Sequence, residues 1–125
     1  MSWGDHLNAQ LVSKGVAKCA LLGAADGAVW ADSQSGLKPG ESAALAKLFS
    51  NPASAFQTGV TVAGVKYLCT RASEDTIAAR KEANGLFLVK SNKAIVLALH
   101  DESMAAGTCN AFAGKAADYF KGLGY

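Results

Sequence analysis

The N-terminal segment carries the apolar spacing of an amphipathic helix. Trp3, Leu7 and Leu11 recur at intervals of four residues, and the Ser-x-x-Asp pattern that starts at Ser2 is typical of a capping box. Gly15 is well suited to end the segment, because glycine readily adopts a positive φ. We therefore predict a first helix over residues 3–14.

The C-terminal segment has the same character. Apolar side chains recur at helical spacing from residue 106 to residue 122, and they form one face that comprises Cys109, Phe112, Ala113, Ala116, Ala117 and Phe120. Tyr119 falls at the edge of this face, whereas Asn110 and Lys115 fall outside it. The pattern predicts a last helix over 106–122, with Gly122 as the residue that ends it.

Between these helices the apolar pattern is that of strands. Two short apolar runs flank the turn Asp26-Gly27 and predict a hairpin. A middle helix is predicted from Pro39-Gly40-Glu41 to Asn51-Pro52, with Ala44, Leu45, Leu48 and Phe49 on its apolar face. Beyond Thr58, five strands with short links predict an antiparallel meander, at 59–62, 65–71, 76–80, 86–89 and 94–99. The fold class is therefore α+β, in one domain over 1–125.

Composition narrows the function classes. Half of the residues are hydrophobic and the net charge is only +2, which argues against disorder and against a nucleic-acid partner. The three cysteines are far apart and odd in number, so neither a disulfide framework nor a zinc site is expected. No signal peptide or membrane-spanning run is visible, and we expect a cytoplasmic protein.

Signals of catalysis are weak. His6 and His100 lack the helical partner of a zinc-binding histidine, and no glycine-rich phosphate loop is present. The run His100-Asp101-Glu102 resembles a base with carboxylates, but it is explained more simply as the polar end of a strand. We expect no enzymatic activity, no cofactor and no metal, and we keep a small enzyme centred on His100 as an alternative.

Basic and aromatic residues offer two candidate binding surfaces. Lysines and arginines concentrate in the second half, where they form either an ordinary solvated face or a surface for an acidic protein or anionic lipid headgroups. Trp3 and Trp30 fit core positions, but Tyr119 and Tyr125 are harder to explain in that way. A shallow groove of Trp and Tyr side chains suits a polyproline II ligand.

Four motifs in sequence order resemble the profilin family along the whole chain. They are Met1-Ser2-Trp3, Asp26-Gly27-Ala28-Val29-Trp30, Ala63-Gly64-Val65-Lys66-Tyr67 with Arg71-Ala72 downstream, and Lys115-Ala116-Ala117-Asp118-Tyr119 before an aromatic last residue. The resemblance implies a central antiparallel sheet with the N- and C-terminal helices packed together on one face and a further short helix on the other.

The resemblance also implies a function. Profilins are cytosolic, mainly monomeric regulators that bind monomeric actin, promote exchange of its nucleotide and deliver it to filament ends. They also bind proline-rich proteins such as formins, and many bind phosphoinositides. A profilin-like scaffold for proline-rich or lipid ligands with little actin activity is the alternative.

Site residues follow by matching positions to the family pattern. The implied polyproline-binding residues are Trp3, His6, Trp30, Tyr119 and Tyr125, and the implied actin-binding residues are Lys66, Arg71, Arg80, Lys81, Lys90, Asn110 and Lys115. Two positions depart from the pattern. His6 stands where the family usually has Tyr, and Glu82 replaces the last glycine of the family's Gly-Lys-Lys-Gly turn.

Overall fold

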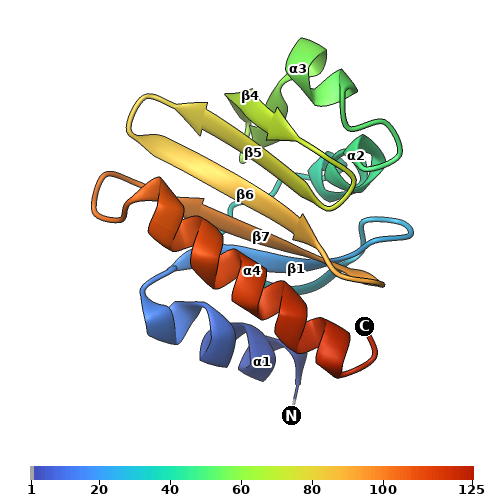
Figure 1. Ribbon diagram of the computed structural model, residues 1–125, viewed down its shortest axis with the longest axis vertical. Coiled ribbons are helices and arrows are strands. Elements are labelled where there is room, and N and C mark those ends of the chain that lie inside the picture. Colours follow the sequence, from blue (N-terminus) through green and yellow to red (C-terminus); the bar gives the residue numbers. More distant parts are fainter. Residues whose placement is uncertain (1) are drawn as a thin grey trace.

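The computed structural model describes residues 2–125 and contains one seven-stranded antiparallel sheet with helices on both sides (Figure 1). The strand order is β2-β1-β7-β6-β5-β4-β3, so the meander from β3 to β7 joins the first hairpin through the pair β1–β7. The strands are β1 (Lys18–Gly23), β2 (Val29–Ser33), β3 (Val60–Val62), β4 (Val65–Ala72), β5 (Thr76–Lys81), β6 (Asn84–Lys90) and β7 (Ala94–His100).

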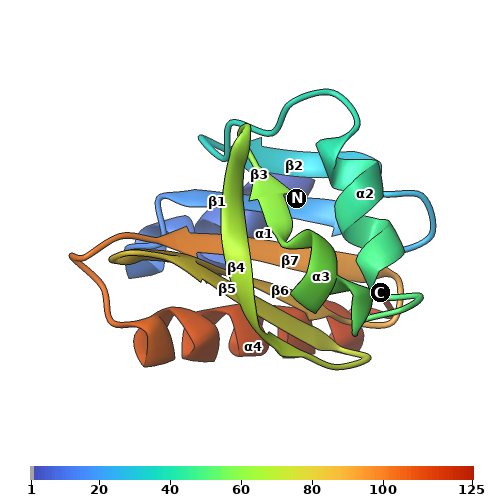
Figure 2. The same cartoon turned by 90° about the horizontal axis from the view of Figure 1, so that it is seen from above.

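Two of the α-helices described lie on each side of the sheet. Helices α1 (Trp3–Gln10) and α4 (Ala106–Gly122) lie together on one side, and α2 (Glu41–Leu48) and α3 (Ser54–Thr58) lie on the other (Figures 1 and 2). This arrangement confirms the predicted fold class. Among the residues described, no helix is both long enough and apolar enough to cross a bilayer.

The first helix begins as its sequence predicts. The Ser2 hydroxyl accepts a hydrogen bond from the Asp5 amide, and the Asp5 carboxylate accepts one from the Ser2 amide, each at 3.1 Å. These bonds satisfy two amide groups that the first helical turn leaves without partners. After α1, a short 3-10 turn (Val12–Lys14) ends at Gly15, whose φ is 98°. Leu7 and Leu11 are buried against the sheet.

Two apolar layers hold the fold together. The layer under α1 and α4 contains Leu7, Leu21, Val96, Ala113 and Phe120, and the layer under α2 and α3 contains Leu22, Leu45, Ile77, Leu88 and Leu97. Alternation along each strand sends successive side chains into opposite layers. The buried face of α4 includes the small residues Ala113, Ala116 and Ala117.

Three local predictions were wrong. Helix α3 was not predicted, because five residues are too few to display a helical period. Ala44 is exposed, and Ala46 takes its place beside Leu45 in the core. The predicted bounds of the last helix, 106–122, are confirmed, but the glycine with positive φ that follows it is Gly124, at 91°, and not Gly122.

Candidate ligand-binding surfaces

Five aromatic side chains from the two ends of the chain and from β2 form one cluster. Trp3 stacks on Trp30 with ring centroids 4.9 Å apart, and Tyr125 meets Trp3 edge-on at 4.7 Å. His6 and Tyr119 complete the cluster, with ring centroids 5.5 Å apart. We call these five residues the aromatic cluster. All five side chains remain partly accessible to solvent, and Tyr125 is 37 % exposed.

The aromatic cluster rests on a buried ring. Phe120 is fully buried, and its ring lies 6.0 Å from that of Trp3 and 6.2 Å from that of His6. Gly23 in β1 leaves room for the indole of Trp30, because a Cβ at Gly23 would come within 3.0 Å of Nε1 of Trp30. The cluster is therefore built on rigid core elements.

A direct hydrogen bond couples the two polar members of the aromatic cluster. Nδ1 of His6 lies 2.7 Å from the hydroxyl oxygen of Tyr119. The imidazole thus takes the Tyr119 hydroxyl as its partner, and the two rings are fixed relative to each other across α1 and α4. The hydrogen bonds found among residues 2–125 include none from the indole N–H of Trp3 or Trp30, and no buried side-chain nitrogen there lacks a partner. The two indole N–H groups are therefore open to solvent and can donate to a ligand.

Residues of the turn between β6 and β7 hold Tyr125 in this cluster. The Ser91 hydroxyl donates a hydrogen bond of 2.8 Å to the main-chain oxygen of Tyr125, and the Lys93 amide donates to the same oxygen. The Tyr125 amide in turn donates to the Phe120 carbonyl at 2.9 Å. Ser91 is a buried polar residue, 6 % exposed. Ser91 lies between the predicted strands 86–89 and 94–99, and nothing in the sequence pattern links it to a residue more than thirty positions away.

Three of the predicted basic residues share one face of the sheet with an exposed leucine. Lys66 and Leu68 alternate with the buried Tyr67 and Cys69, and Arg80 pairs with Leu68 across β4 and β5. An irregularity in the register between Cys69 and Arg71 places Arg71 opposite Ala78, on this same face. We call Lys66, Leu68, Arg71 and Arg80 the basic face.

The basic face is on the side of the sheet that carries α4. Lys115 on that helix is exposed and Asn110 is half-buried. Leu68 is 70 % exposed and was not among the predicted site residues. The signal was available in the sequence, since strand alternation places Leu68 with Lys66 and away from Tyr67.

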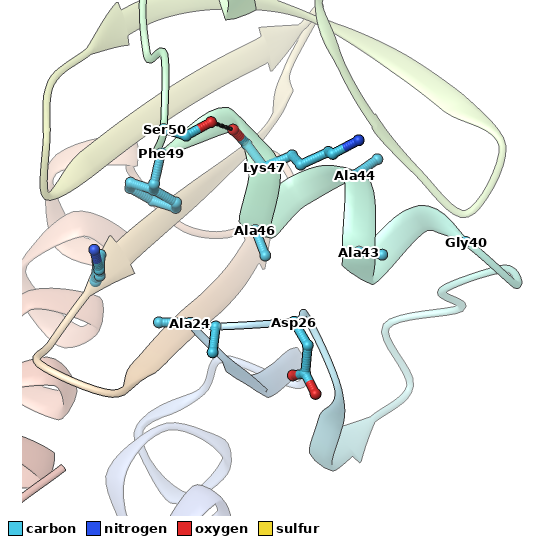
Figure 3. Close-up of a pocket in the computed structure, with 11 residues that line it drawn as sticks. Ala24, Asp26, Gly40, Ala43, Ala44, Ala46, Lys47, Phe49 and Ser50 are labelled. Atoms are coloured by element: carbon cyan, nitrogen blue, oxygen red, sulfur yellow. Dashed lines mark hydrogen bonds between the residues drawn. The ribbon is translucent and has the colours of Figure 1, made fainter.

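The other two predicted lysines lie on the opposite side of the sheet. Lys81 continues the alternation of Ile77 and Ala79, which are buried under α2 and α3. Lys90 continues that of Leu86 and Leu88, and it lines a cavity of about 600 Å³ beside α2 (Figure 3). The walls of this cavity also include Ala24, Asp26, Ala43, Lys47 and Phe49. The seven residues predicted for one partner are therefore divided between two sides of the sheet.

The candidate base at His100 lacks the geometry of a catalytic pair. The Asp101 carboxylate accepts hydrogen bonds from the amide and hydroxyl of Ser103, and these bonds lower the pKa of Asp101. The His100 ring lies over Phe87 at 6.1 Å, and its Nδ1 is 3.2 Å from the carbonyl oxygen of Asp101. The carboxylate thus caps its own turn and does not orient the imidazole.

The thiols are also unsuited to nucleophilic chemistry. Burial raises the pKa of Cys19 to about 12 and that of Cys109 to about 11, so both remain protonated at neutral pH. Burial likewise raises the pKa of Cys69. Within residues 2–125, no group of three or more His, Cys, Asp or Glu side chains is placed to hold a metal ion.

Comparison with known proteins gives a consistent result. The family model described as Profilin matches residues 1–125. Profilin-1 of Dictyostelium discoideum is 38 % identical over 128 residues and is covered completely, as is this chain. The structure of Acanthamoeba castellanii profilin IB superposes with a TM-score of 0.92 at 33 % identity, over 99 % of this chain and all of that one.

A more distant structure shares the fold. Mouse profilin IIa, solved in complex with a double repeat from the FH1 domain of mDia1, has a TM-score of 0.77 at 19 % identity, with complete coverage of both chains. Sequence and fold comparisons agree over nearly the full length of the chain. The chain belongs to the profilin family.

Proposed function

We propose that this protein binds monomeric actin and proline-rich segments, and that it regulates actin assembly by coupling the two. In this role it sequesters monomers, promotes exchange of their nucleotide and delivers them to filament ends. It performs no covalent chemistry and acts in the cytoplasm, where its partners are. Anionic phosphoinositide headgroups are further ligands of its basic surfaces. Membership of the profilin family and the two surfaces described above support this function.

The aromatic cluster is the observation that supports a proline-rich ligand. A polyproline II segment is preformed, so it loses little conformational entropy when it packs its rings on aromatic faces. The stacked indoles of Trp3 and Trp30 offer such faces, and their N–H groups are available to carbonyl oxygens of the ligand. The mouse complex with an FH1 repeat is a precedent on the same fold.

The basic face supports an acidic protein partner. Three cations surround the exposed Leu68, which combines charge complementarity with an apolar anchor. We propose that the basic face and the outer surface of α4, with Lys115 and Asn110, dock on the actin monomer. Lys81 and Lys90 on the other side of the sheet are then left for anionic ligands.

The test of the proline-rich ligand is a titration with a polyproline peptide, followed by tryptophan fluorescence. We expect the emission to change and saturate, because the two indoles lie in one cluster. Trp3→Phe keeps a ring but removes an N–H donor, and we expect it to weaken binding. Phe56→Ala removes an exposed aromatic on α3 and serves as the control. An unchanged affinity in Trp3→Phe together with a loss in Phe56→Ala would place the ligand elsewhere.

The test of the actin partner is direct binding to labelled monomeric actin. We expect Lys115→Glu to weaken binding, whereas Lys47→Glu, an equal charge reversal on α2, should leave it unchanged. Circular dichroism should show that both variants keep the fold. Failure of the wild-type protein to bind actin would favour the alternative, a profilin-like scaffold with little actin activity. The division of the predicted lysines between two sides of the sheet also favours that alternative.

A further inference from the structure

A second cavity, of about 730 Å³, opens on the α2 side of the sheet at one end of the strands. Its walls come from the start of β1, β4 and β6, from the ends of β5 and β7, and from the segment after β2. This volume is in the range of small-molecule sites. The cavity shares no lining residue with the aromatic cluster and none with the cavity beside α2.

The rim of this cavity is built from constrained backbone. Within residues 2–125, the non-glycine residues with a positive φ are Gln34, Ala63 and Glu82, and all three line this cavity. Left-handed backbone is costly for residues with a Cβ. Ala63 and Glu82 lie in the hairpin turns that precede β4 and β6, so the hairpins fix the rim in place.

A buried phenol opens into the cavity. Tyr67 is only 8 % exposed and packs in the core, yet none of the hydrogen bonds found among residues 2–125 involves its hydroxyl. No buried side-chain oxygen of those residues is left without a partner, so the hydroxyl reaches the open space of the cavity. Burial raises the pKa of Tyr67, which keeps the group a hydrogen-bond donor.

Two lysines stand on the same face of the sheet as Tyr67. Lys18 pairs with Leu99 across β1 and β7, and Lys81 pairs with Asn84 across β5 and β6. Cross-strand partners share a face of the sheet. The side chains of Lys18 and Lys81 therefore lie on the same side of the sheet as Leu99, which lines the cavity with an apolar surface.

The carboxylates of the cavity lie at its rim. Asp101 is engaged by Ser103, and the nearby Lys18 contributes to its lowered pKa. Glu82 lies in the turn after β5. The donors of Tyr67, Lys18, Lys81 and Asn84 are thus supplied by the sheet, whereas the acids come from the turns.

We propose that this cavity is a binding site for a small organic anion with an apolar body. The acidic group accepts hydrogen bonds from the Tyr67 hydroxyl and from the ammonium groups of Lys18 and Lys81. The apolar body packs on Leu99 and Val65, which line the same cavity. The site is independent of the proposed actin and polyproline surfaces.

The probe is anilinonaphthalene sulfonate, an aromatic anion whose fluorescence rises in apolar surroundings. We expect saturable binding to the full-length protein, and NMR chemical-shift changes at the amides of Tyr67, Asn84 and Leu99. The uncharged N-phenylnaphthylamine has a similar body and no acidic group. It should bind about tenfold more weakly, because it lacks the charge-assisted hydrogen bonds.

Variants test the assigned donors. Tyr67→Phe keeps the buried ring and should weaken sulfonate binding several-fold, and the pair Lys18→Gln with Lys81→Gln should weaken it by about tenfold. Lys47→Gln removes a cation from the cavity beside α2 and should have no effect. Equal binding of the two dyes, shift changes confined to the aromatic cluster or to α2, or unaltered binding in the Tyr67 and lysine variants would each overturn the proposal.

Discussion

At the scale of single residues, the contact between His6 and Tyr119 links the two polar members of the aromatic cluster. His6 has no hydroxyl group to donate a hydrogen bond to a ligand, but its Nδ1 lies 2.7 Å from the Tyr119 hydroxyl oxygen. A hydroxyl in such a contact is held in one orientation, so a ligand meets a preorganised surface. His6 therefore acts on the ligand partly through Tyr119.

Replacing Tyr119 with phenylalanine tests this coupling. The change removes the hydroxyl, leaves Nδ1 of His6 without its partner and keeps the ring, so we expect affinity for a polyproline peptide to fall by about five- to tenfold. Stability should fall by about 1 kcal/mol, because one partly buried hydrogen bond is lost. Fluorescence titration and urea unfolding measure the two effects. An affinity equal to that of the wild type would show that the hydroxyl does not order the cluster.

The buried thiols give a residue-scale prediction for pH. Burial raises the pKa of Cys19 from 9.0 to about 12, so the folded state favours the protonated thiol. This contribution to stability is complete below pH 9 and is lost as the pH rises from 9 toward 12, because only the unfolded chain ionises freely there. We expect the free energy of unfolding to decrease over that window. A Cys19→Ala variant should show a smaller decrease, and an identical pH dependence would contradict this account.

At the scale of elements, the turn between β6 and β7 fixes the C-terminal segment. Ser91 and Lys93 both donate to the main-chain oxygen of Tyr125, whose ring contacts Trp3 and Trp30. The end of α4 also holds the last residues, because the Gly124 amide donates to the Lys121 carbonyl and the Tyr125 amide donates to the Phe120 carbonyl. The aromatic cluster thus depends on a turn that contributes no side chain to it.

Ser91→Ala should separate the support of the cluster from its ligand contacts. The change removes the bonds of the Ser91 hydroxyl to the main-chain oxygen of Tyr125 and to the backbone of Ala94 in a mostly buried place, so we expect a loss of about 1–3 kcal/mol in stability. We also expect several-fold weaker binding of a polyproline peptide, since Tyr125 is held less firmly. Ser50→Ala is the matched control, because Ser50 also donates to a backbone carbonyl, that of Lys47, but in the exposed turn just after α2. Full affinity in Ser91→Ala would contradict a positioning role for the turn.

At the scale of the whole molecule, the sequence predicted what local periodicity and turn chemistry determine. The capping box at Ser2, the Asp26-Gly27 hairpin and the five-strand meander are all confirmed. The pairing of β1 with β7 joins segments far apart in sequence, and no local pattern encodes it. For the same reason Ser91 was missed, and the convergence of Trp3, Trp30 and Tyr125 came from family resemblance.

The basic residues show a different limit of prediction. Matching positions to the family pattern assigned Arg80 and Lys81 to one surface, although adjacent strand residues point to opposite sides of a sheet. The irregular register between Cys69 and Arg71 could not be seen in the pattern, and it shifts Arg71 onto the face of Lys66. Assigning a strand residue to one side of this sheet therefore requires the alternation of residues along the strand and the position of the bulge in β4.

Arg80 and Lys81 make the sharpest test of which side of the sheet meets actin. They are neighbours in β5, both are exposed, and they carry equal charge on opposite sides. If the basic face docks on an acidic actin surface, Arg80→Glu should weaken monomer binding by about tenfold or more, because it sets like charges against each other. Lys81→Glu changes the net charge by the same amount, so long-range steering is matched and only the local contact differs. The dissociation constant of labelled monomeric actin, measured at two salt concentrations, separates the two effects. A larger loss in Lys81→Glu would move the actin contact to the α2 side and leave the basic face around Leu68 for another partner.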